Sequence, residues 1–598
     1  MVVATAQFKQ KFPKWVALWP KDERFTAEPL REAVVGDVRR AVLVLAGAVS
    51  FLFLIACANL ANLLLARATV RRREMAIRAS LGAARQRLVC QVLTESVLLS
   101  IAGSMLGLPL GYLGVRALIA INNGQIPRID PHGTTLMLDT RVFAFALLAS
   151  LFSAILFGLL PALYASRLDP GALVNEGGER VGASLQHKKT RAGLVIGEIA
   201  VALVLLTGAT LLIRTFIALR MLNPGFDANN VVTMEMSLND SRFKNIASIS
   251  QLIRDAERRI ESLPGVVALA ATYSLPLENP FGNSFVIEAH PNDPYGSSLC
   301  YVSRHYFDVF HIPLLRGRLF TERDATESAP VVLVNEAMLN GSSGHYQWRA
   351  ALSWRNGDPL GERITIGKNL GPPNEDRTRE VIGVVGEVRD AGLSLGPQPI
   401  MYVPIPQLTD QTTRMLKSGL PLVWTIRTRG EPAQMTRVIQ RELRAASGGL
   451  PIAHVREMNQ VVAESTARNR FNMILLSSFA GAALLLAAVG VYGVMAYAVQ
   501  HRTHEIGIRI ALGARPRDVR RMVLFEGGRH AVIGIFIGIL GALALTPLLR
   551  SLLYGVKPTD PGIFSIAVLL LGAVALLATY IPARWPTKVD PTVALRWE

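Results

Sequence analysis

One stretch of the sequence resembles a phosphate-binding loop: residues 361–369 read GERITIGKN. A P-loop has four residues between its two glycines and a hydroxyl residue after its lysine, since that hydroxyl binds Mg²⁺. Here five residues separate Gly361 from Gly367, and Asn369 replaces the hydroxyl. No other nucleotide-binding motif occurs in the sequence. We therefore expect a strand and a turn at 361–369, and we expect neither a cofactor nor an enzymatic activity in this chain.

Other ionisable side chains indicate chemistry less specifically. His501 and His504 lie three residues apart without a further ligand pattern, so we expect no metal site. Glu95, Glu198 and Glu526 each lie near the end of an apolar run. Acidic residues within membrane helices are often functional, but these three lie close enough to the membrane interface to find polar partners. We expect structural pairing rather than a proton relay.

Two further segments place a carboxylate and a guanidinium at a spacing that favours pairing. Glu74 and Arg78, and likewise Glu505 and Arg509, are four residues apart, so on a helix they face each other. Two apolar residues at the same spacing accompany each pair and form a stripe that the groove of a partner can accept. A glycine then follows where the helix would end. The stripes are Ile77 with Leu81 and Ile508 with Leu512, and the glycines are Gly82 and Gly513.

The composition is that of a membrane protein. Of 598 residues, 50% are hydrophobic and only 18% are charged, whereas soluble proteins carry about a quarter charged residues. The formal net charge of +18 is compatible with nucleic acid or a membrane surface as partner. The basic excess lies in short loops beside apolar runs, while the long polar region between Arg220 and Arg470 is nearly neutral. We expect contact with membrane lipid and no binding of nucleic acid.

Seven apolar stretches are long enough to cross the roughly 30 Å hydrocarbon layer as helices of about 20 residues. The predicted spans are 41–66, 92–120, 141–164, 193–219, 471–499, 522–553 and 562–583. Arginine-rich loops follow the first, third and fifth spans, which predicts that these loops and the C-terminus are cytoplasmic. Residues 1–40 and about 220–470 are then extracytoplasmic.

An internal repeat relates the first three spans to the last three. Residues 74–83, EMAIRASLGA, are similar to residues 505–514, EIGIRIALGA, which lie 431 positions later. The same offset pairs Gly103 with Gly534 and Gly107 with Gly538, for which we predict close helix packing between the two half-units. The fourth span opens the second unit, and the first copy lacks an opening helix and most of an outer domain. We therefore expect a chain that is shortened at its N-terminus or has a misplaced start.

These motifs resemble those of a known family. The signature E-x-G-I-R-x-A-L-G-A is similar to that of the FtsX-type permease domain of MacB-like ABC transporters. It is complete in 505–514, whereas Ala76 and Ser80 alter it in the first copy. The region after the fourth span resembles the periplasmic core domain of this family in the phrases NPGFD at 223–227, LPGV at 263–266 and VVGEV at 384–388. Nearly the whole chain resembles a duplicated MacB-like permease with a truncated N-terminus.

The resemblance implies a fold and a division of the chain. The fold class is an α-helical membrane protein with an extracytoplasmic α+β domain, which we expect to have two subdomains. The expected divisions are a remnant of the first outer domain at 1–40, a first FtsX-type domain at 41–192 with a coupling segment at 71–88, a helix at 193–219, a periplasmic core domain at 220–470, and a second FtsX-type domain at 471–598 with a coupling segment at 502–520.

The resemblance also implies a function. It predicts a multi-pass permease of the bacterial inner membrane that couples ATP hydrolysis by a separate ABC ATPase subunit to extracytoplasmic movement and substrate efflux. A periplasmic adaptor protein is a candidate partner. An FtsX-like signal transmitter and a lipoprotein-extracting permease are alternatives, and the large outer region favours the MacB side. The residues expected to contact the ATPase are Glu74, Ile77, Arg78, Leu81, Gly82, Ala83, Glu505, Gly507, Ile508, Arg509, Leu512, Gly513 and Ala514.

Overall fold

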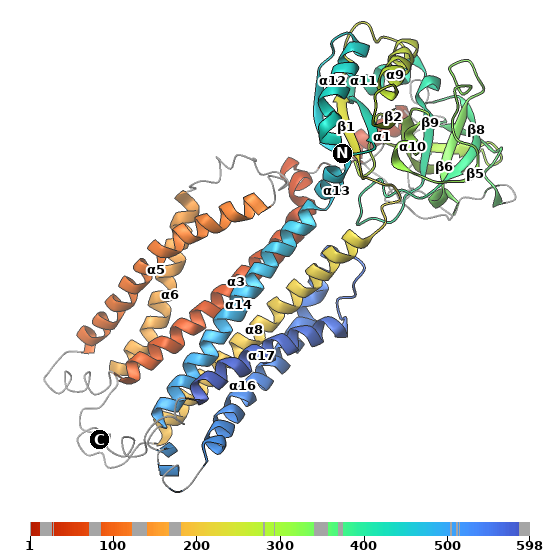
Figure 1. Ribbon diagram of the computed structural model, residues 1–598. Helices are drawn as coiled ribbons and strands as arrows, with labels where there is room; N and C mark the ends of the chain where they lie inside the picture. The colour runs from red at the N-terminus through yellow and green to blue at the C-terminus, as the bar shows by residue number, and fades with distance from the viewer. Residues whose placement is uncertain are drawn as a thin grey trace. The chain divides into compact units, whose positions relative to one another are not determined.

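The structure is a computed structural model in which the chain forms two compact units. One, here the α+β unit, comprises Met1–Leu30 and Met221–Thr466, and the other, the helical unit, comprises Arg31–Arg220 and Ala467–Glu598 (Figure 1). The residues that the structure describes are 2–11, 25, 27, 29–70, 85–121, 140–166, 181–278, 281–291, 293–339, 354, 357–368, 375–502, 505, 506, 508, 509, 512 and 515–584.

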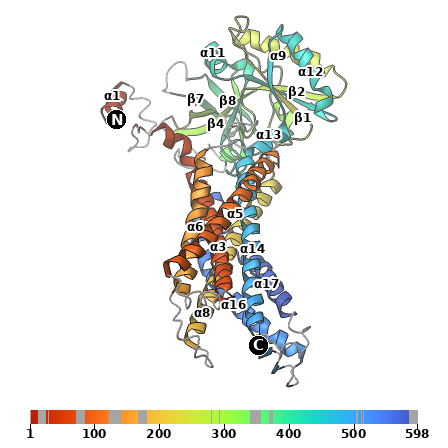
Figure 2. The ribbon, with the colours of Figure 1, turned by 90° about the vertical axis from the view of Figure 1, so that its left-hand side faces the viewer.

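The α+β unit is built on a sheet of eleven strands (Figures 1 and 2). The strands are β1 (Val231–Met236), β2 (Val266–Thr272), β3 (Phe281–Ile287), β4 (Pro294–Val302), β5 (Leu314–Gly317), β6 (Val331–Asn335), β7 (Arg363–Ile366), β8 (Thr378–Val385), β9 (Ile400–Pro404), β10 (Leu422–Thr428) and β11 (Ile452–Glu457). The helices are α1 (Val2–Lys11), α9 (Ile246–Glu261), α10 (Tyr306–Phe310), η2 (Glu336–Met338), η4 (Ile405–Gln407), α11 (Asp410–Gly419), α12 (Pro432–Ser447) and α13 (Met458–Ser465).

The sheet has two parts. Four antiparallel strands form one part in the order β11-β1-β10-β2. The other part closes on itself in the order β4-β3-β7-β8-β6-β9, because β9 also pairs with β4 in parallel, and β5 pairs with β8 outside this order. A single residue pair, Thr272 with Val302, joins β2 to β4. The unit therefore has the predicted α+β character and two differently built parts.

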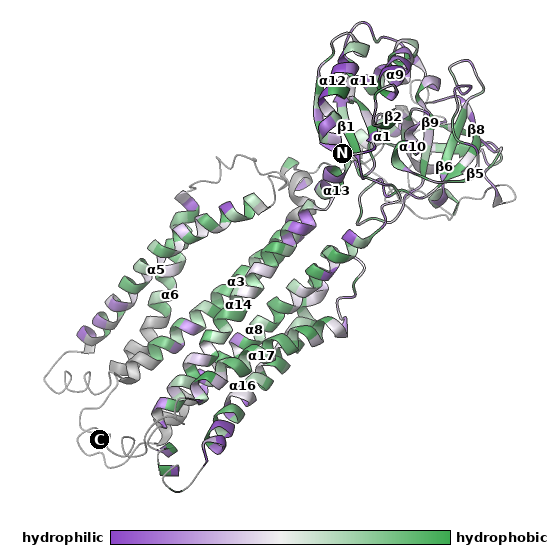
Figure 3. Ribbon diagram, in the orientation of Figure 1, coloured by the Kyte–Doolittle hydropathy of each residue, from purple (hydrophilic) through white to green (hydrophobic). Residues whose placement is uncertain are grey.

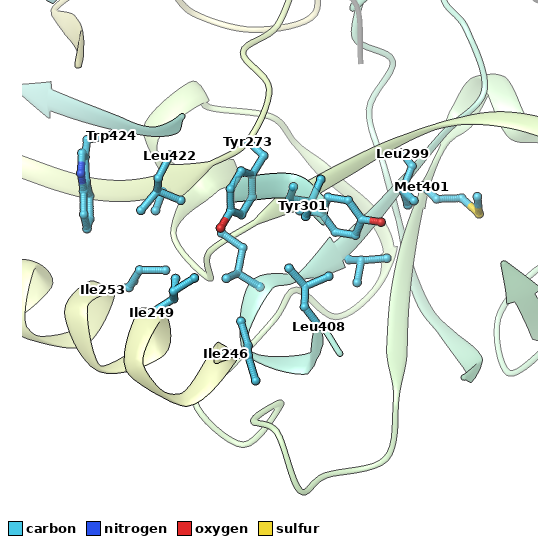
Figure 4. Close-up of a cluster of buried hydrophobic side chains, with 14 of the residues drawn as sticks. Ile246, Ile249, Ile253, Tyr273, Leu299, Tyr301, Met401, Leu408, Leu422 and Trp424 are labelled. Atoms are coloured by element: carbon cyan, nitrogen blue, oxygen red, sulfur yellow. The ribbon is translucent and has the colours of Figure 1, made fainter. Parts of the chain in front are cut away.

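Helix α9 packs on the four-stranded part through one apolar face. Its buried residues recur every three or four positions, as an amphipathic helix requires. Ile249 and Ile253 face Leu422 and Trp424 of β10 (Figure 4). All four side chains are at most 5% exposed, and burying one such side chain contributes about 1.5–3 kcal/mol. This packing holds the helix on the sheet.

The helical unit is made of long apolar helices (Figure 3). In the described part they are α3 (Leu30–Val70), α5 (Arg85–Ile121), α6 (Thr140–Ser166), α8 (Val181–Met221), α14 (Ala467–His501), α16 (Pro516–Leu545) followed by η5 (Thr546–Leu552), and α17 (Pro561–Ala583). Six of them, all but α6, are long and apolar enough to cross a membrane. In α6 the described apolar stretch, Thr140–Leu156, is a shorter one. Six of the seven predicted spans therefore coincide with such helices.

Glycines of α16 allow α8 to approach closely. A Cβ at Gly534 would lie 2.8 Å from the Cβ of Ile199, and one at Gly538 would lie 2.9 Å from a carbonyl oxygen of the same helix. Because α8 is the opening helix of the second unit, the prediction that these glycines pack between the two half-units is wrong. Among the described residues, no heavy atom lies within 4 Å of a Cβ built at Gly103 or Gly107. The repeated glycines thus meet different surroundings.

Candidate coupling site

The second signature segment joins the end of α14 to the start of α16. The structure describes five of its residues: Glu505, Ile506, Ile508, Arg509 and Leu512. The Ile506 N–H donates to the carbonyl oxygen of Arg502 at 2.8 Å, and the Leu512 N–H donates to that of Ile508 at 2.9 Å. These four-residue hydrogen bonds are helical. The predicted residues outside the described part are Glu74, Ile77, Arg78, Leu81, Gly82, Ala83, Gly507, Gly513 and Ala514.

The predicted ion pair of the second copy is present. The Nη2 atom of Arg509 lies 2.7 Å from the Oε1 atom of Glu505, and both side chains are about half exposed. Water weakens such a pair, so its contribution is about 0.3–0.5 kcal/mol. The other terminal nitrogen of Arg509 lies 2.8 Å from the sulfur of Met522 in α16. Arg509 therefore connects the segment to the following helix.

The apolar residues of the segment divide into a buried and an exposed set. Ile506 is 2% exposed, whereas Ile508 is 39% and Leu512 is 83% exposed. Ile508 and Leu512 are four residues apart, which places them on one side of a helix. An exposed apolar pair beside a charged pair is a small surface of the kind that a partner protein can cover.

A second ion pair holds the two helices together behind this surface. Arg502, just after α14, donates to both carboxylate oxygens of Glu526 in α16, at 2.6 Å and 3.4 Å. Arg502 is thus the structural partner predicted for Glu526. The segment between the two helices is therefore anchored at its start and, through Arg509, in its middle.

A polar cluster lies where α3, α8 and α14 meet; it contains Glu198, for which a structural partner was expected, and two asparagines that the sequence reasoning missed. The Asn62 amide donates to the Oε1 atom of Glu198 at 3.4 Å, and the Asn59 amide donates to the Leu486 carbonyl at 2.9 Å. Glu198 is 2% exposed, and its Oε2 atom fits only because Gly490 has no side chain. The sequence signal for this cluster is the presence of two asparagines three residues apart within an apolar run. Polar groups in such a place hold helices together.

The α+β unit contains a buried ionisable cluster that the sequence did not indicate. The Cys300 thiol donates to the Oδ2 atom of Asp390 at 3.3 Å, and both residues are about 1% exposed. Burial raises the pKa of Asp390 to about 7 and that of the Cys300 thiol well above its usual value. In the described part, the buried hydroxyls of Tyr306 and Tyr402 have no hydrogen-bond partner. Burial therefore favours the protonated form of Asp390.

The loop that resembles a phosphate-binding site is a strand between two turns. Strand β7, Arg363–Ile366, lies between Gly361 and Gly367, whose φ angles are +78° and +66°. The expected strand-and-turn structure is thus confirmed, while Asn369 lies outside the described residues. Among the described side chains, no three His, Cys, Asp or Glu residues are arranged to hold a metal ion.

Comparison with known families covers most of the chain. Residues 46–170 and 477–591 match the family described as FtsX-like permease C-terminal. Residues 190–446 match the MacB-like periplasmic core domain. The two FtsX-like matches coincide with the two halves of the internal repeat, and the match between them coincides with most of the α+β unit.

Relatives are similar over a part of their length. The macrolide export ATP-binding/permease protein MacB of Wolinella succinogenes is 27% identical over 379 residues, which cover 62% of this chain and 52% of that protein. The pyoverdine export ATP-binding/permease protein PvdT of Pseudomonas syringae pv. syringae is 28% identical over 302 residues, 49% of this chain and 42% of that protein. The chain spans about half the length of the curated relatives it matches.

Two solved structures are similar to part of the chain. The periplasmic region of MacB from Actinobacillus actinomycetemcomitans matches with a TM-score of 0.26 and 17% identity, over 40% of this chain and 92% of that one. The extracellular domain of the ABC-type transporter YknZ from Gram-positive bacteria matches with a TM-score of 0.24 and 16% identity, over 38% of this chain and 100% of that one.

Proposed function

From the premise that this chain is a MacB/FtsX-like ABC permease, we propose that it transmits the movement of a separate ABC ATPase to its extracytoplasmic α+β unit. The observation that carries the proposal is the exposed apolar pair Ile508 and Leu512 beside the Glu505–Arg509 ion pair. The segment presents charge and apolar area together, which suits a partner that docks and then moves with it. We assign the same role to residues 74–83 because the repeat relates them.

The anchoring of the segment supports this role. A force on Leu512 is transmitted to α16 through the contact of Arg509 with Met522. It is transmitted to the junction with α14 through the ion pair of Arg502 with Glu526. Helix α14 runs from His501 back to Ala467, which directly follows helix α13 of the α+β unit. Displacement at one end of a continuous helix is passed to its other end, because its backbone hydrogen bonds make it stiff.

We infer the orientation from the charges of the loops. The basic loops support a cytoplasmic position of the coupling segments and the C-terminus, and an extracytoplasmic position of residues of about 220–470. The protein is a multi-pass membrane protein of the inner membrane, and in this orientation the coupling segments meet the compartment that holds ATP. The ATPase is a separate subunit in this proposal.

Export of a hydrophobic or amphipathic substrate is the proposed outcome of the movement. The matched relatives are named for macrolide export and for pyoverdine export, which supports efflux over signal transmission or lipoprotein extraction. A periplasmic adaptor protein is a further proposed partner. ATP-dependent efflux of a macrolide from vesicles that contain the permease and its ATPase is the direct assay. Activation of a cell-wall hydrolase without efflux would favour the FtsX-like alternative.

Photo-crosslinking tests whether Ile508 and Leu512 contact the ATPase. A photoreactive phenylalanine analogue is placed at position 508 or 512 in cells that express the full chain. We expect a crosslinked partner that labels with 8-azido-ATP and contains a Walker A motif by mass spectrometry. The matched control is position 569 on α17, where Leu569 is 71% exposed and apolar but lies away from the segment.

Two results would contradict the proposal. Equal capture of the ATPase from position 569 would show that the contact is unspecific. Crosslinks from 508 and 512 that reach only lipid, or only proteins that bind no ATP, would remove the coupling role from this surface.

A further inference from the structure

A groove of about 600 Å³ lies within the helical unit, between α3, α8 and η5. Helix α3 contributes Arg40, Val44 and Phe51, whose spacing places them on one face. The volume is within the range of about 300–1,000 Å³ that is typical of sites for small ligands. Neither Ile508 nor Leu512, the exposed apolar pair of the coupling segment, lines this groove. The groove is therefore distinct from that pair.

The groove is apolar and open at its rim. Gly47 of α3 and Gly208 of α8 lack side chains where the two helices line it, which leaves a hollow. Leu205, which is 3% exposed, lies deep in the groove. Leu43 and Leu548 also line it, but they are 63% and 64% exposed. Apolar side chains this exposed in a membrane helix face the lipid, so a molecule can enter the groove from the bilayer.

Two arginines line the same groove. Arg40 lies in the first turn of the span Arg39–Leu65, and Arg550 lies in the last turn of the span Pro516–Leu552. The start of one span and the end of the other therefore lie at the same membrane surface. Both arginines are exposed. No carboxylate lines the groove, and in the described part of the chain neither arginine has a salt bridge.

We propose that this groove is a binding site for one anionic phospholipid, which inserts an acyl chain between α3 and α8 and places its phosphate between Arg40 and Arg550. The apolar hollow matches a hydrocarbon chain. The two guanidinium groups, which have no salt bridge in the described part of the chain, match a phosphodiester, to which Arg binds with two parallel hydrogen bonds. In the proposed orientation the lipid comes from the extracytoplasmic leaflet. It joins a helix of the first repeat to helices of the second.

Native mass spectrometry of the detergent-purified full chain tests the site. The probes are phosphatidylglycerol and phosphatidylcholine with identical acyl chains, titrated separately, and inorganic phosphate as a competitor. We expect phosphatidylglycerol to bind more tightly than phosphatidylcholine, and each of R40Q and R550Q to weaken phosphatidylglycerol binding about fivefold, since an arginine near an anionic headgroup contributes about that factor. The matched control is R468Q, because Arg468 is also an exposed arginine near the end of a span but does not line the groove.

A second variant tests the apolar part independently. No described heavy atom lies within 4 Å of a Cβ built at Gly47, so the backbone there accepts a side chain, and Gly47→Leu directs one into the groove. We expect it to weaken the binding of both lipids roughly tenfold, because an acyl chain can no longer pack there. Gly528→Leu is its control, since Gly528 is also open but lies outside the groove.

Three results would overturn the proposal. The first is equal affinity of the two lipids for the unchanged chain. The second is unchanged phosphatidylglycerol binding in the R40Q/R550Q chain or, if that variant does not fold, in the Gly47→Leu chain. The third is displacement of the lipid by millimolar inorganic phosphate, which would identify a simple anion site.

Discussion

At the scale of single residues, three carboxyl groups differ in burial and in partner: Glu526 is partly exposed, whereas Asp324 and Asp390 are buried. Glu526 has the guanidinium of Arg502, and Asp324 has that of Arg318, which together with nearby hydrogen bonds outweighs burial and keeps the pKa of Asp324 below its usual value. In the described part of the chain, Asp390 has the thiol of Cys300 as its hydrogen-bond partner and no arginine or lysine paired with it. Its loss of water on burial therefore favours the neutral form.

Asp390 makes the stability of the α+β unit depend on pH. Its pKa is about 7 in the folded unit and near 3.8 when the chain is unfolded, so the folded state holds the proton more tightly. The contribution of Asp390 to stability is therefore largest below about pH 4 and falls as the pH rises to about 7, by about 4 kcal/mol in total. We expect protection of the β4 and β9 amides against hydrogen exchange to fall about a hundredfold between pH 5 and pH 8, after correction for intrinsic rates.

The Asp390→Asn variant provides the test of this assignment. It should remove most of the pH dependence, because an amide does not titrate. Asp293→Asn is the control, since Asp293 is exposed, and it should leave the pH dependence as it is. Retention of the full pH dependence by D390N would show that another group is responsible.

At the scale of elements, the two copies of the repeat place the same glycines in different environments. Helix α8 fills the space beside Gly534 and Gly538, whereas Gly103 and Gly107 of α5 are open in the described part. The membrane-spanning part of α8 is also the most buried of the six candidate spans, and that of α5 is the least. Sequence equivalence therefore does not imply equivalent packing.

This difference predicts opposite outcomes for matched substitutions. Gly538→Leu should destabilise the helical unit by about 1–3 kcal/mol or more, because its side chain would overlap α8. Gly107→Leu should leave stability almost unchanged. The measurement is the temperature at which half of the purified chain is lost from the monodisperse chromatographic peak. Equal losses for both variants would mean that α8 is not the relevant neighbour.

A tight turn at the start of the α+β unit gives a second matched pair. Gly225 has a φ angle of +86°, and a Cβ there would lie 1.8 Å from the carbonyl oxygen of Glu387. Gly361 has a similar φ of +78° but no described heavy atom within 4 Å. Gly361→Ala should therefore cost only the strain of its backbone, about 1–2 kcal/mol, and Gly225→Ala should cost clearly more. Thermal unfolding of the two variants, compared side by side, gives the answer, and equal costs would refute the close contact.

At the scale of the whole molecule, the chain combines helices that face lipid with a sheet unit that has its own core. The hydropathy of the helices and that of the α+β unit differ plainly (Figure 3). The chain passes between the units at the start of α3, at the end of α8 and at the start of α14. Long apolar helices confine the helical unit to the bilayer. The side of the membrane on which the α+β unit lies therefore fixes the orientation of the chain.

Labelling of introduced cysteines measures this direction. In a chain without Cys57, Cys90 and Cys300, we expect Leu512→Cys to react with a membrane-impermeant maleimide only after the membrane is opened. Arg429→Cys, at an exposed position of the α+β unit, should react in intact spheroplasts. Reaction of position 512 from the outside would reverse the proposed orientation and end the coupling proposal.

The sequence by itself determined six of the long apolar helices, that a separate α+β unit exists, and where the repeated signature lies. These features depend on local properties, namely the length and hydropathy of a run, the alternation of strands and helices, and the four-residue spacing that pairs Glu505 with Arg509. Each of these properties depends on residues that are close together in the sequence, and the described structure contains the elements that they predict.

Only the tertiary structure decided which partners meet. The contact of Asn62 with Glu198 joins residues 136 positions apart, and the pairing of Cys300 with Asp390 joins residues 90 positions apart. Nothing local distinguishes Gly534 from Gly103, because the difference is the presence of α8 beside one of them. The groove with its two arginines likewise exists only because α3 and η5, more than 450 residues apart in the sequence, line the same space. Side chains can meet in this way only after the helices have packed.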